Sequence, residues 1–357
     1  MEDVIEAAVQ AIEQGRSHAL VTPVLTQGSV PTGRGARLLV ASDGSTVGTV
    51  GGGAVEAEAT RRAMETACSG KPSLMHCQLT ARDALADGLL CGGEATFLLE
   101  PLTADMLEPL RAVAASVRAN RPCVEAIRLV EGLPVQRLVI DAEGKTTGTL
   151  GAAELDQALV MQRDDIVAKD DAVIRQMQSQ DMEVEVFVQA LQRRPTVYIF
   201  GGGHVGLALA RLVPVAGMDV VVVDDREEFC NRDRFPMAAA LHVRSFDAAV
   251  EGLDLDPLAY VVVMTRGHQW DREVVAQALR TQAGYIGMIG SRRKIALIWQ
   301  ALRDAGFSDA DLARVYAPVG LDIGGDTPGE IAISITAQLI QVRRQGGAPP
   351  NPASASP

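Results

Sequence analysis

The strongest constraint on the fold is a glycine-rich turn that joins an apolar run to an amphipathic helix. In the segment 196–228, TVYIFGGGHVGLALARLVPVAGMDVVVVDDREE, Gly201, Gly203 and Gly206 follow the apolar residues 197–200. Glycines here permit a tight turn, close packing of helix on strand and approach of backbone N–H groups to a phosphate. Asp224 ends the next apolar run, eighteen residues after Gly206, where a carboxylate can accept from ribose hydroxyls. The pattern predicts a Rossmann-type, doubly wound parallel α/β domain for a phosphate-bearing ligand, against the alternative of such a domain that has lost its ligand.

Polar loops follow three later apolar runs in the same half of the chain, and a helix opened by Thr327 and Pro328 follows the last loop. Loops at the carboxyl ends of parallel strands converge on one crevice. The residues expected in that crevice are His204, Asp224, Arg266, His268, Ser291, Arg292, Lys294 and Asp322.

Some of these residues also have simpler explanations. His204 can face solvent, and His268 can form a local hydrogen bond with Asp271. The basic residues 292–294 can be a solvated helix start, although positive charge there opposes the helix dipole and favours an anionic ligand.

Length and charge limit the class of protein. The 357 residues fit two or three domains, and a formal net charge of -12 disfavours binding to nucleic acid or to anionic membrane surfaces. No apolar run approaches the ~20 residues of a membrane span, and residues 1–16 read as an amphipathic helix, not a signal peptide. Five cysteines without a C-x-x-C pair argue against a disulfide framework and a structural zinc site, and favour the cytoplasm.

The chain is expected to have an α+β domain at 1–192, the Rossmann-type domain at 195–345 and a disordered tail at 346–357. The first domain is expected to contain a faint duplication, with repeats at about 18–105 and 120–192, against the alternative of a chance match. Residues 37–51 and 137–151 are identical at seven of fifteen positions, and both predict a hairpin followed by a helix. Each repeat is expected to close with a strand, at 94–102 and at 183–191.

The first repeat carries glycine-rich loops that the second lacks, and loops are where a repeated scaffold gains function. Three segments could present backbone N–H groups, a cation or a thiol to an anion. Their candidate residues are Gly28, Ser29 and Arg34, then Gly51, Gly52, Gly53 and Glu56, then Cys91, Gly92 and Gly93. A buried small hydrophobe is the simpler interpretation of a cysteine, and it is the one we give to Cys68, Cys77, Cys123 and Cys230.

Taken together, these motifs resemble the XdhC/CoxI family, the accessory factors of xanthine dehydrogenase and related molybdenum hydroxylases. The resemblance covers nearly the whole chain apart from the tail. It rests on Gly28-Ser29 with Pro31, Asp43-Gly44 with residues 48–53 and Glu56, Cys91-Gly92-Gly93 with Glu100-Pro101, residues 201–206, residues 265–268 with Asp271, residues 287–294 and residues 318–330. Two departures are Thr32, where the family usually has arginine, and Gly329, where it usually has an acid.

The resemblance implies a chaperone for the molybdenum cofactor, in its plain pterin or cytosine dinucleotide form. Such proteins protect the cofactor while a cysteine desulfurase provides sulfur, and insert it into an apo-hydroxylase of the xanthine dehydrogenase type. An accessory factor, and not an enzyme, is therefore expected, with Cys91 as a molybdenum or sulfur contact and a homodimer as the assembly.

Two other functions fit parts of the sequence. An NAD(P)-dependent oxidoreductase would use the glycine loop and Asp224, although no substrate domain with a placed proton donor is evident. A sulfurtransferase would use Cys91 as a persulfide carrier.

Overall fold

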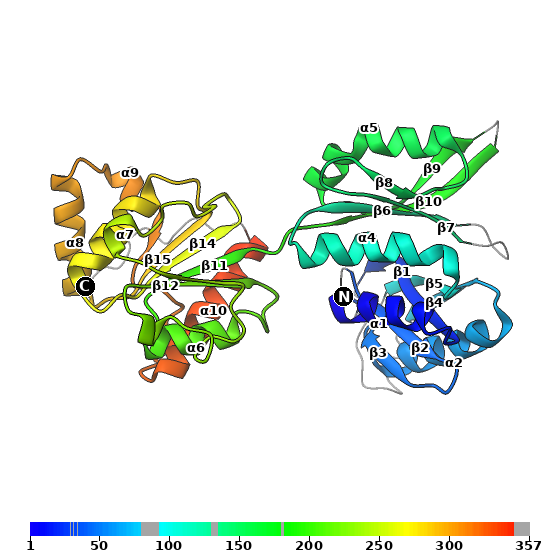
Figure 1. Ribbon diagram of the computed structural model, residues 1–357, viewed down its shortest axis with the longest axis horizontal. Coiled ribbons are helices and arrows are strands. Elements are labelled where there is room, and N and C mark those ends of the chain that lie inside the picture. Colours follow the sequence, from blue (N-terminus) through cyan, green and yellow to red (C-terminus); the bar gives the residue numbers. More distant parts are fainter. Residues whose placement is uncertain are drawn as a thin grey trace. The chain divides into compact units, whose positions relative to one another are not determined.

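The computed structural model divides into two compact units, Met1–Arg193 and Arg194–Pro357 (Figure 1). It describes residues 1–28, 30, 32–33, 35–79, 93–129, 135–179 and 182–345. The candidate residues Ser29, Arg34, Cys91 and Gly92 and the tail at 346–357 lie outside the described residues. Each unit is considered by itself.

The first unit contains two antiparallel five-stranded sheets with the same strand order, β3-β2-β1-β5-β4 and β8-β7-β6-β10-β9. The first sheet comprises β1 (His18–Gly28), β2 (Arg37–Ala41), β3 (Thr46–Thr49), β4 (Ser73–Leu79) and β5 (Gly93–Pro101). The second comprises β6 (Cys123–Leu129), β7 (Gln136–Ile140), β8 (Thr146–Gly148), β9 (Ala172–Ser179) and β10 (Met182–Leu191). The matching orders support the duplication proposed from sequence.

Helices cover both sheets of this unit. They are α1 (Glu2–Glu13), α2 (Gly53–Ser69), the short 3-10 helix η1 (Ala104–Met106), α4 (Leu107–Arg118) and α5 (Ala153–Lys169). Helix α2 packs on one face of the first sheet and α5 on one face of the second. The two sheets share a small core that includes Leu98 and Phe187. Helices α1 and α4 form a second core with residues of both sheets. Helix α1 buries Val4, Ile5 and Ala8, which confirms the amphipathic helix expected there.

The second unit is a six-stranded parallel sheet in the order β13-β12-β11-β14-β15-β16. Its strands are β11 (Thr196–Phe200), β12 (Asp219–Asp224), β13 (Ala240–Val243), β14 (Ala259–Val263), β15 (Tyr285–Met288) and β16 (Val315–Tyr316). Counted along the unit, this order is 3-2-1-4-5-6, which is that of dinucleotide-binding domains. The Rossmann-type fold predicted from the glycine turn is confirmed, and the strand order reverses between β11 and β14.

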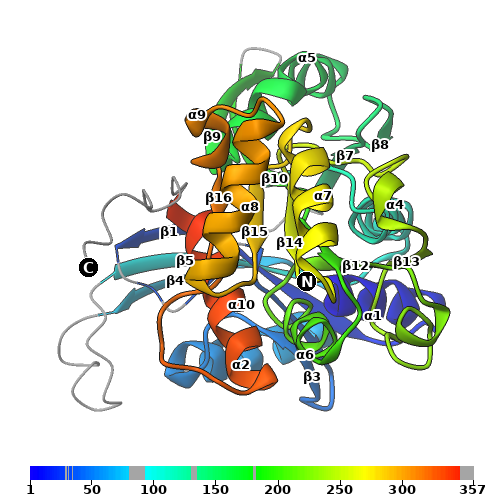
Figure 2. The same ribbon diagram turned by 90° about the vertical axis from the view of Figure 1, so that its left-hand side faces the viewer.

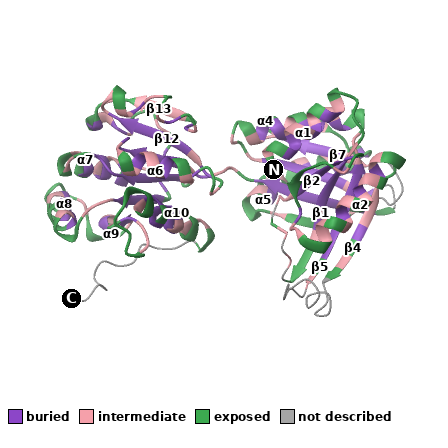
Figure 3. Cartoon of the chain, turned by 90° about the horizontal axis from the view of Figure 1, so that it is seen from below, coloured by how far each residue is buried: buried purple, intermediate pink, exposed green. Residues whose placement is uncertain are grey.

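Helices lie on both faces of this sheet (Figure 2). They are α6 (His204–Leu212), η2 (Glu227–Phe229), η3 (Phe246–Ala248), α7 (His268–Leu279), α8 (Arg292–Asp304), α9 (Asp309–Leu312) and α10 (Pro328–Gln345). Helices α7 and α8 share one core with the sheet, and α6 and α10 share the other. Figure 3 shows the buried residues concentrated along the strands. None of the helices among the described residues is long and apolar enough to cross a membrane.

Candidate functional site

The glycine loop is shaped by close approaches within the second unit. A Cβ at Gly201 would lie 2.3 Å from the carbonyl oxygen of Met264, and one at Gly206 would lie 2.1 Å from the carbonyl oxygen of Gly201. The N–H of Gly201 donates to the Val223 carbonyl over 2.8 Å. These two glycines therefore let β11, β14 and α6 pack together, whatever the loop binds.

The start of α6 is the open part of this loop. Gly203 is the N-cap residue, and a Cβ built there meets no atom within 4 Å. No side chain caps the helix, and His204 is exposed. The first N–H groups of a helix have no partner inside it, so this end can accept an anion.

The carboxylate of Asp224, which was expected to accept from ribose hydroxyls, accepts hydrogen bonds from donors of the protein. Its side chain is 1% exposed. One carboxylate oxygen accepts from the N–H of Gly202 at 2.8 Å and from Arg226 Nη2 at 3.2 Å. The other accepts from the N–H and the Nε of Arg226, both at 3.0 Å. Burial would raise the pKa of Asp224, but these donors outweigh it and the pKa is lowered. In this structure the Asp224 carboxylate therefore holds the glycine loop.

Three residues that follow β12 lie on the Gly202 side of the loop. A Cβ at Gly202 would lie 2.0 Å from the Phe229 carbonyl oxygen. The Arg226 guanidinium lies over the Phe229 ring, 3.7 Å from its centroid. Arg234 donates to the Gly202 carbonyl at 3.0 Å. Arg226 and Arg234 were not predicted from sequence, although both follow the strand that Asp224 ends.

Asp271 joins the loops after β14 and β15. Its buried carboxylate accepts from the N–H of Thr265 at 2.9 Å and from the Thr265 hydroxyl at 2.7 Å, and it pairs with Lys294. The partners of Asp271 are therefore Thr265 and Lys294, and not His268, for which a local hydrogen bond with Asp271 was considered. The ammonium group of Lys294 therefore has Asp271 as a partner within the protein.

The remaining candidates of this unit are more exposed. Arg266, whose side chain is 52% exposed, pairs with Asp225 at 2.8 Å. Ser291 caps α8 by accepting from the N–H of Lys294, and Arg292 is exposed. Asp322 lies in an exposed loop before α10. Thr327 accepts from the N–H of Glu330 and precedes Pro328, the first residue of α10, which confirms the predicted helix start.

In the first unit, Glu56 closes the turn that was expected to offer N–H groups. Its carboxylate accepts from the N–H groups of Val50 at 2.9 Å and Gly52 at 3.2 Å, and from the Thr49 hydroxyl at 2.5 Å. The Thr49 hydroxyl, followed by the backbone donors, lowers the pKa of Glu56 despite burial. Asp156 accepts from Thr149 and Leu150 in the second repeat. The same arrangement therefore holds this turn in both repeats, and Gly51 and Gly53 have the positive φ that the turn requires.

Gly28 and Gly93 lie opposite each other on β1 and β5. Gly28 is the last residue of β1 and Gly93 the first of β5, and the two strands are antiparallel. The segment with Ser29 and Arg34 follows β1, and the segment with Cys91 and Gly92 precedes β5. Both segments therefore join the sheet at the same end of these two neighbouring strands. This pairing brings together the attachment points of two candidate loops that are far apart in the sequence.

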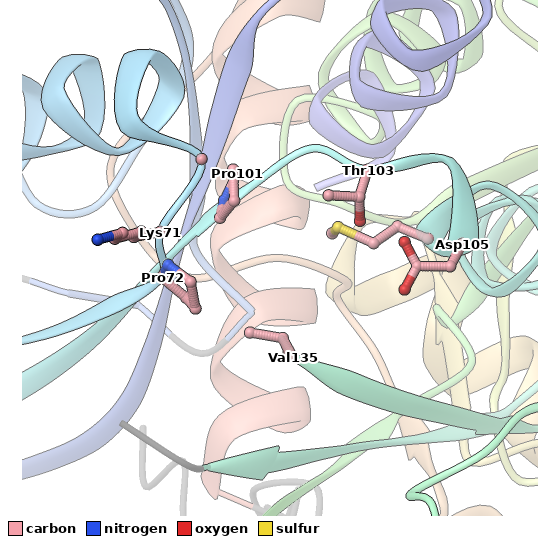
Figure 4. Close-up of a pocket in the computed structure, with 8 residues that line it drawn as sticks. Lys71, Pro72, Pro101, Thr103, Asp105 and Val135 are labelled. Atoms are coloured by element: carbon pink, nitrogen blue, oxygen red, sulfur yellow. The ribbon is translucent and has the colours of Figure 1, made fainter. Parts of the chain in front are cut away.

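A cavity of about 420 Å³ lies in the same unit, at the other end of β5 (Figure 4). It is lined by Gly70, Lys71, Pro72, Pro101, Thr103, Asp105, Met106 and Val135. None of the site residues predicted from sequence lines it, although Pro101 belongs to the Glu100-Pro101 motif. Its lining mixes apolar groups with Lys71 and Asp105, which does not single out one ligand.

Comparisons with known proteins agree along nearly the whole chain. Residues 3–78 match the XdhC and CoxI family, and residues 197–339 match the XdhC Rossmann domain. A protein of Bacillus subtilis named as a probable xanthine dehydrogenase subunit is 24% identical over 336 residues, which are 94% of this chain and 96% of that protein. The molybdenum cofactor insertion chaperone PaoD of Escherichia coli is 26% identical over 346 residues, 95% of this chain and 88% of that protein.

Two further relatives extend the comparison. The protein YqeB of Escherichia coli is 27% identical over 342 residues, and the chain spans 46% of its length, about half. A crystal structure of a xanthine dehydrogenase from Bacillus halodurans has a TM-score of 0.75 at 25% identity, with 99% of this chain and 98% of that one covered. The matched segments and this whole-chain likeness show that the chain belongs to the XdhC and CoxI family.

Proposed function

We propose that this protein binds the molybdenum cofactor and inserts it into an apo-hydroxylase of the xanthine dehydrogenase type. Family membership supports this role, as do relatives named as a molybdenum cofactor insertion chaperone and as a probable xanthine dehydrogenase subunit. In this proposal the protein is an accessory factor that acts in the cytoplasm as a homodimer, and a cysteine desulfurase provides sulfur while the cofactor is held.

The observation that carries the proposal is the pairing of Gly28 with Gly93. It places the attachment points of two candidate loops at the same end of β1 and β5, and the sequence of those loops supplies Ser29, Arg34 and Cys91. A guanidinium and a hydroxyl suit the phosphate of a pterin cofactor, and a soft thiolate suits molybdenum or its sulfur ligand. The donor set therefore fits the cofactor. When bound, the cofactor supplies the metal centre of the recipient hydroxylase.

The residues of the loops have separate roles in this proposal. Arg34 and Ser29 would orient the phosphate, and Cys91 would contact the molybdenum or the sulfur. Glu56 would act from outside the contact surface, because it holds the turn at Val50 and Gly52.

Cofactor retention tests the proposal at these residues. Protein produced with molybdenum cofactor would be desalted, and bound pterin would be measured as its fluorescent oxidation product together with molybdenum. We expect wild-type protein to retain both and Cys91→Ser and Arg34→Ala to lose most of each. Cys68→Ser is the matched control, because Cys68 is a free, exposed thiol of the same unit. Equal retention by Cys91→Ser, Arg34→Ala and wild type would contradict the assignment.

A further inference from the structure

Arg226 occupies the position from which Rossmann-type domains read ribose. In such domains the carboxylate at the end of the second strand accepts from ribose hydroxyls. Here that carboxylate is Asp224, the last residue of β12. Four protein donors reach it, and three of them belong to Arg226.

A carboxylate offers about four acceptor positions. The N–H of Gly202 and the N–H, Nε and Nη2 of Arg226 fill these positions at 2.8–3.2 Å. A ribose diol would have to displace the Arg226 guanidinium from Asp224, leaving that cation with only the more distant carboxylate of Asp225, at 3.6 Å. Hydrogen bonds to charged groups contribute roughly 1.5–3 kcal/mol, so the displacement is costly.

The guanidinium is held from a second side. Arg226 lies 3.7 Å above the centroid of the Phe229 ring, and its side chain is only 26% exposed. The backbone at Phe229 in turn lies against Gly202, where a Cβ would come within 2.0 Å of the carbonyl oxygen. Arg226 and Phe229 are therefore packed against the glycine loop, and these contacts restrict the Arg226 side chain.

We propose that Arg226 is a specificity-determining residue that closes the ribose position of the second unit, so that the unit rejects ligands recognised through a ribose diol, including NAD(H). The loop stays open only at Gly203 and the start of α6, where it can meet a phosphate but not the sugar next to it. This proposal is independent of the molybdenum cofactor and argues against the NAD(H)-dependent form of the oxidoreductase alternative.

Titration with NADH tests the proposal. Both tryptophans of the chain, Trp270 and Trp299, belong to the second unit, so energy transfer from tryptophan to NADH reports binding there. We expect no saturable binding by the full-length wild type up to 1 mM NADH, about the weakest affinity the titration measures. Arg226→Met keeps an apolar stem on Phe229 and removes the side-chain donors, so we expect at least ten-fold tighter NADH binding.

Three further variants separate the proposal from other effects. Arg211→Met removes an exposed positive charge from α6 without touching Asp224, and should bind NADH no better than wild type. Arg226→Lys keeps the charge with a single donor group and should give a smaller gain. Adding Asp224→Asn to Arg226→Met should abolish the gain. Saturable NADH binding by wild type, or no gain in a folded Arg226→Met protein, would overturn the proposal. Either result leaves the cofactor retention assay unaffected.

Discussion

Arg37 and Arg137 stand one hundred residues apart in the sequence and donate to the same carboxylate, that of Glu125. The two arginines begin the matched segments of the two repeats, on β2 and on β7. Arg137 also pairs with Glu100 of β5. All four side chains are at most 2% exposed, so this ion network fixes how the two repeats of the first unit pack.

Replacing Glu125 by Gln should destabilise the protein strongly. The substitution leaves two buried guanidinium groups with one carboxylate, and breaking a buried pair by removing one partner costs about 3–5 kcal/mol. Urea unfolding followed by far-UV circular dichroism measures the change. Glu58→Gln is the control, because Glu58 pairs with Arg61 and Arg62 on the exposed face of α2, and it should change the midpoint little. A Glu125→Gln protein as stable as the control would contradict the role of the network.

Glu125 should also make stability depend on pH. Burial would raise its pKa, but Arg37 and Arg137 outweigh that effect and lower the pKa to about 2. Because the unfolded value is about 4.3, the unfolded state binds the proton more readily between these values. The stabilisation is therefore complete above about pH 5 and is lost as the pH falls towards 2. Unfolding free energies at several pH values from about 6 to about 3 should fall more steeply for wild type than for Glu125→Gln, and equal slopes would disprove the assignment.

Two alanine substitutions in the glycine loop should differ in their effect on the stability of the second unit. Gly206→Ala places a methyl group 2.1 Å from the Gly201 carbonyl oxygen, and overpacking of this kind costs about 1–3 kcal/mol. Gly203→Ala meets open space and a φ of -66°, so the second unit should keep its stability. Thermal unfolding followed by the fluorescence of Trp270 and Trp299 measures the melting temperature of this unit. Equal melting temperatures for the two variants would refute the packing role of Gly206.

The described cysteines should differ in reactivity. Burial raises the pKa of Cys123 to about 12 and also raises the pKa of Cys230. Cys68 is exposed. Since the thiolate is the reactive form, native protein treated with iodoacetamide at about pH 7.5 should be modified rapidly at Cys68 and slowly at the two buried residues. Peptide mass spectrometry gives the rates, and rapid labelling of Cys230 in folded protein would show that the loop around it opens.

The sequence predicted the elements whose signal lies in residues close to one another along the chain. The glycine turn at Gly201 to Gly206 and the start of α10 depend on residues near in sequence, and the hairpins of the two repeats depend on turns at Gly44 and Gly144. The partners of the charged residues could not be predicted in this way. Glu125 accepts from Arg37 and Asp224 accepts from Gly202, and only the folded chain brings these donors near the carboxylates. The matched arginines at 37 and 137 were the one sequence signal for the buried network.

Transfer of cofactor to a recipient enzyme measures the proposed function most directly. The loaded protein would be mixed with an apo-hydroxylase of the xanthine dehydrogenase type, and hydroxylase activity followed over time against free cofactor at equal concentration. We expect faster and more complete activation by the loaded protein, together with loss of molybdenum from it in proportion to the activity gained. Activation no better than with free cofactor, or with an unrelated acidic protein added, would contradict the proposed function.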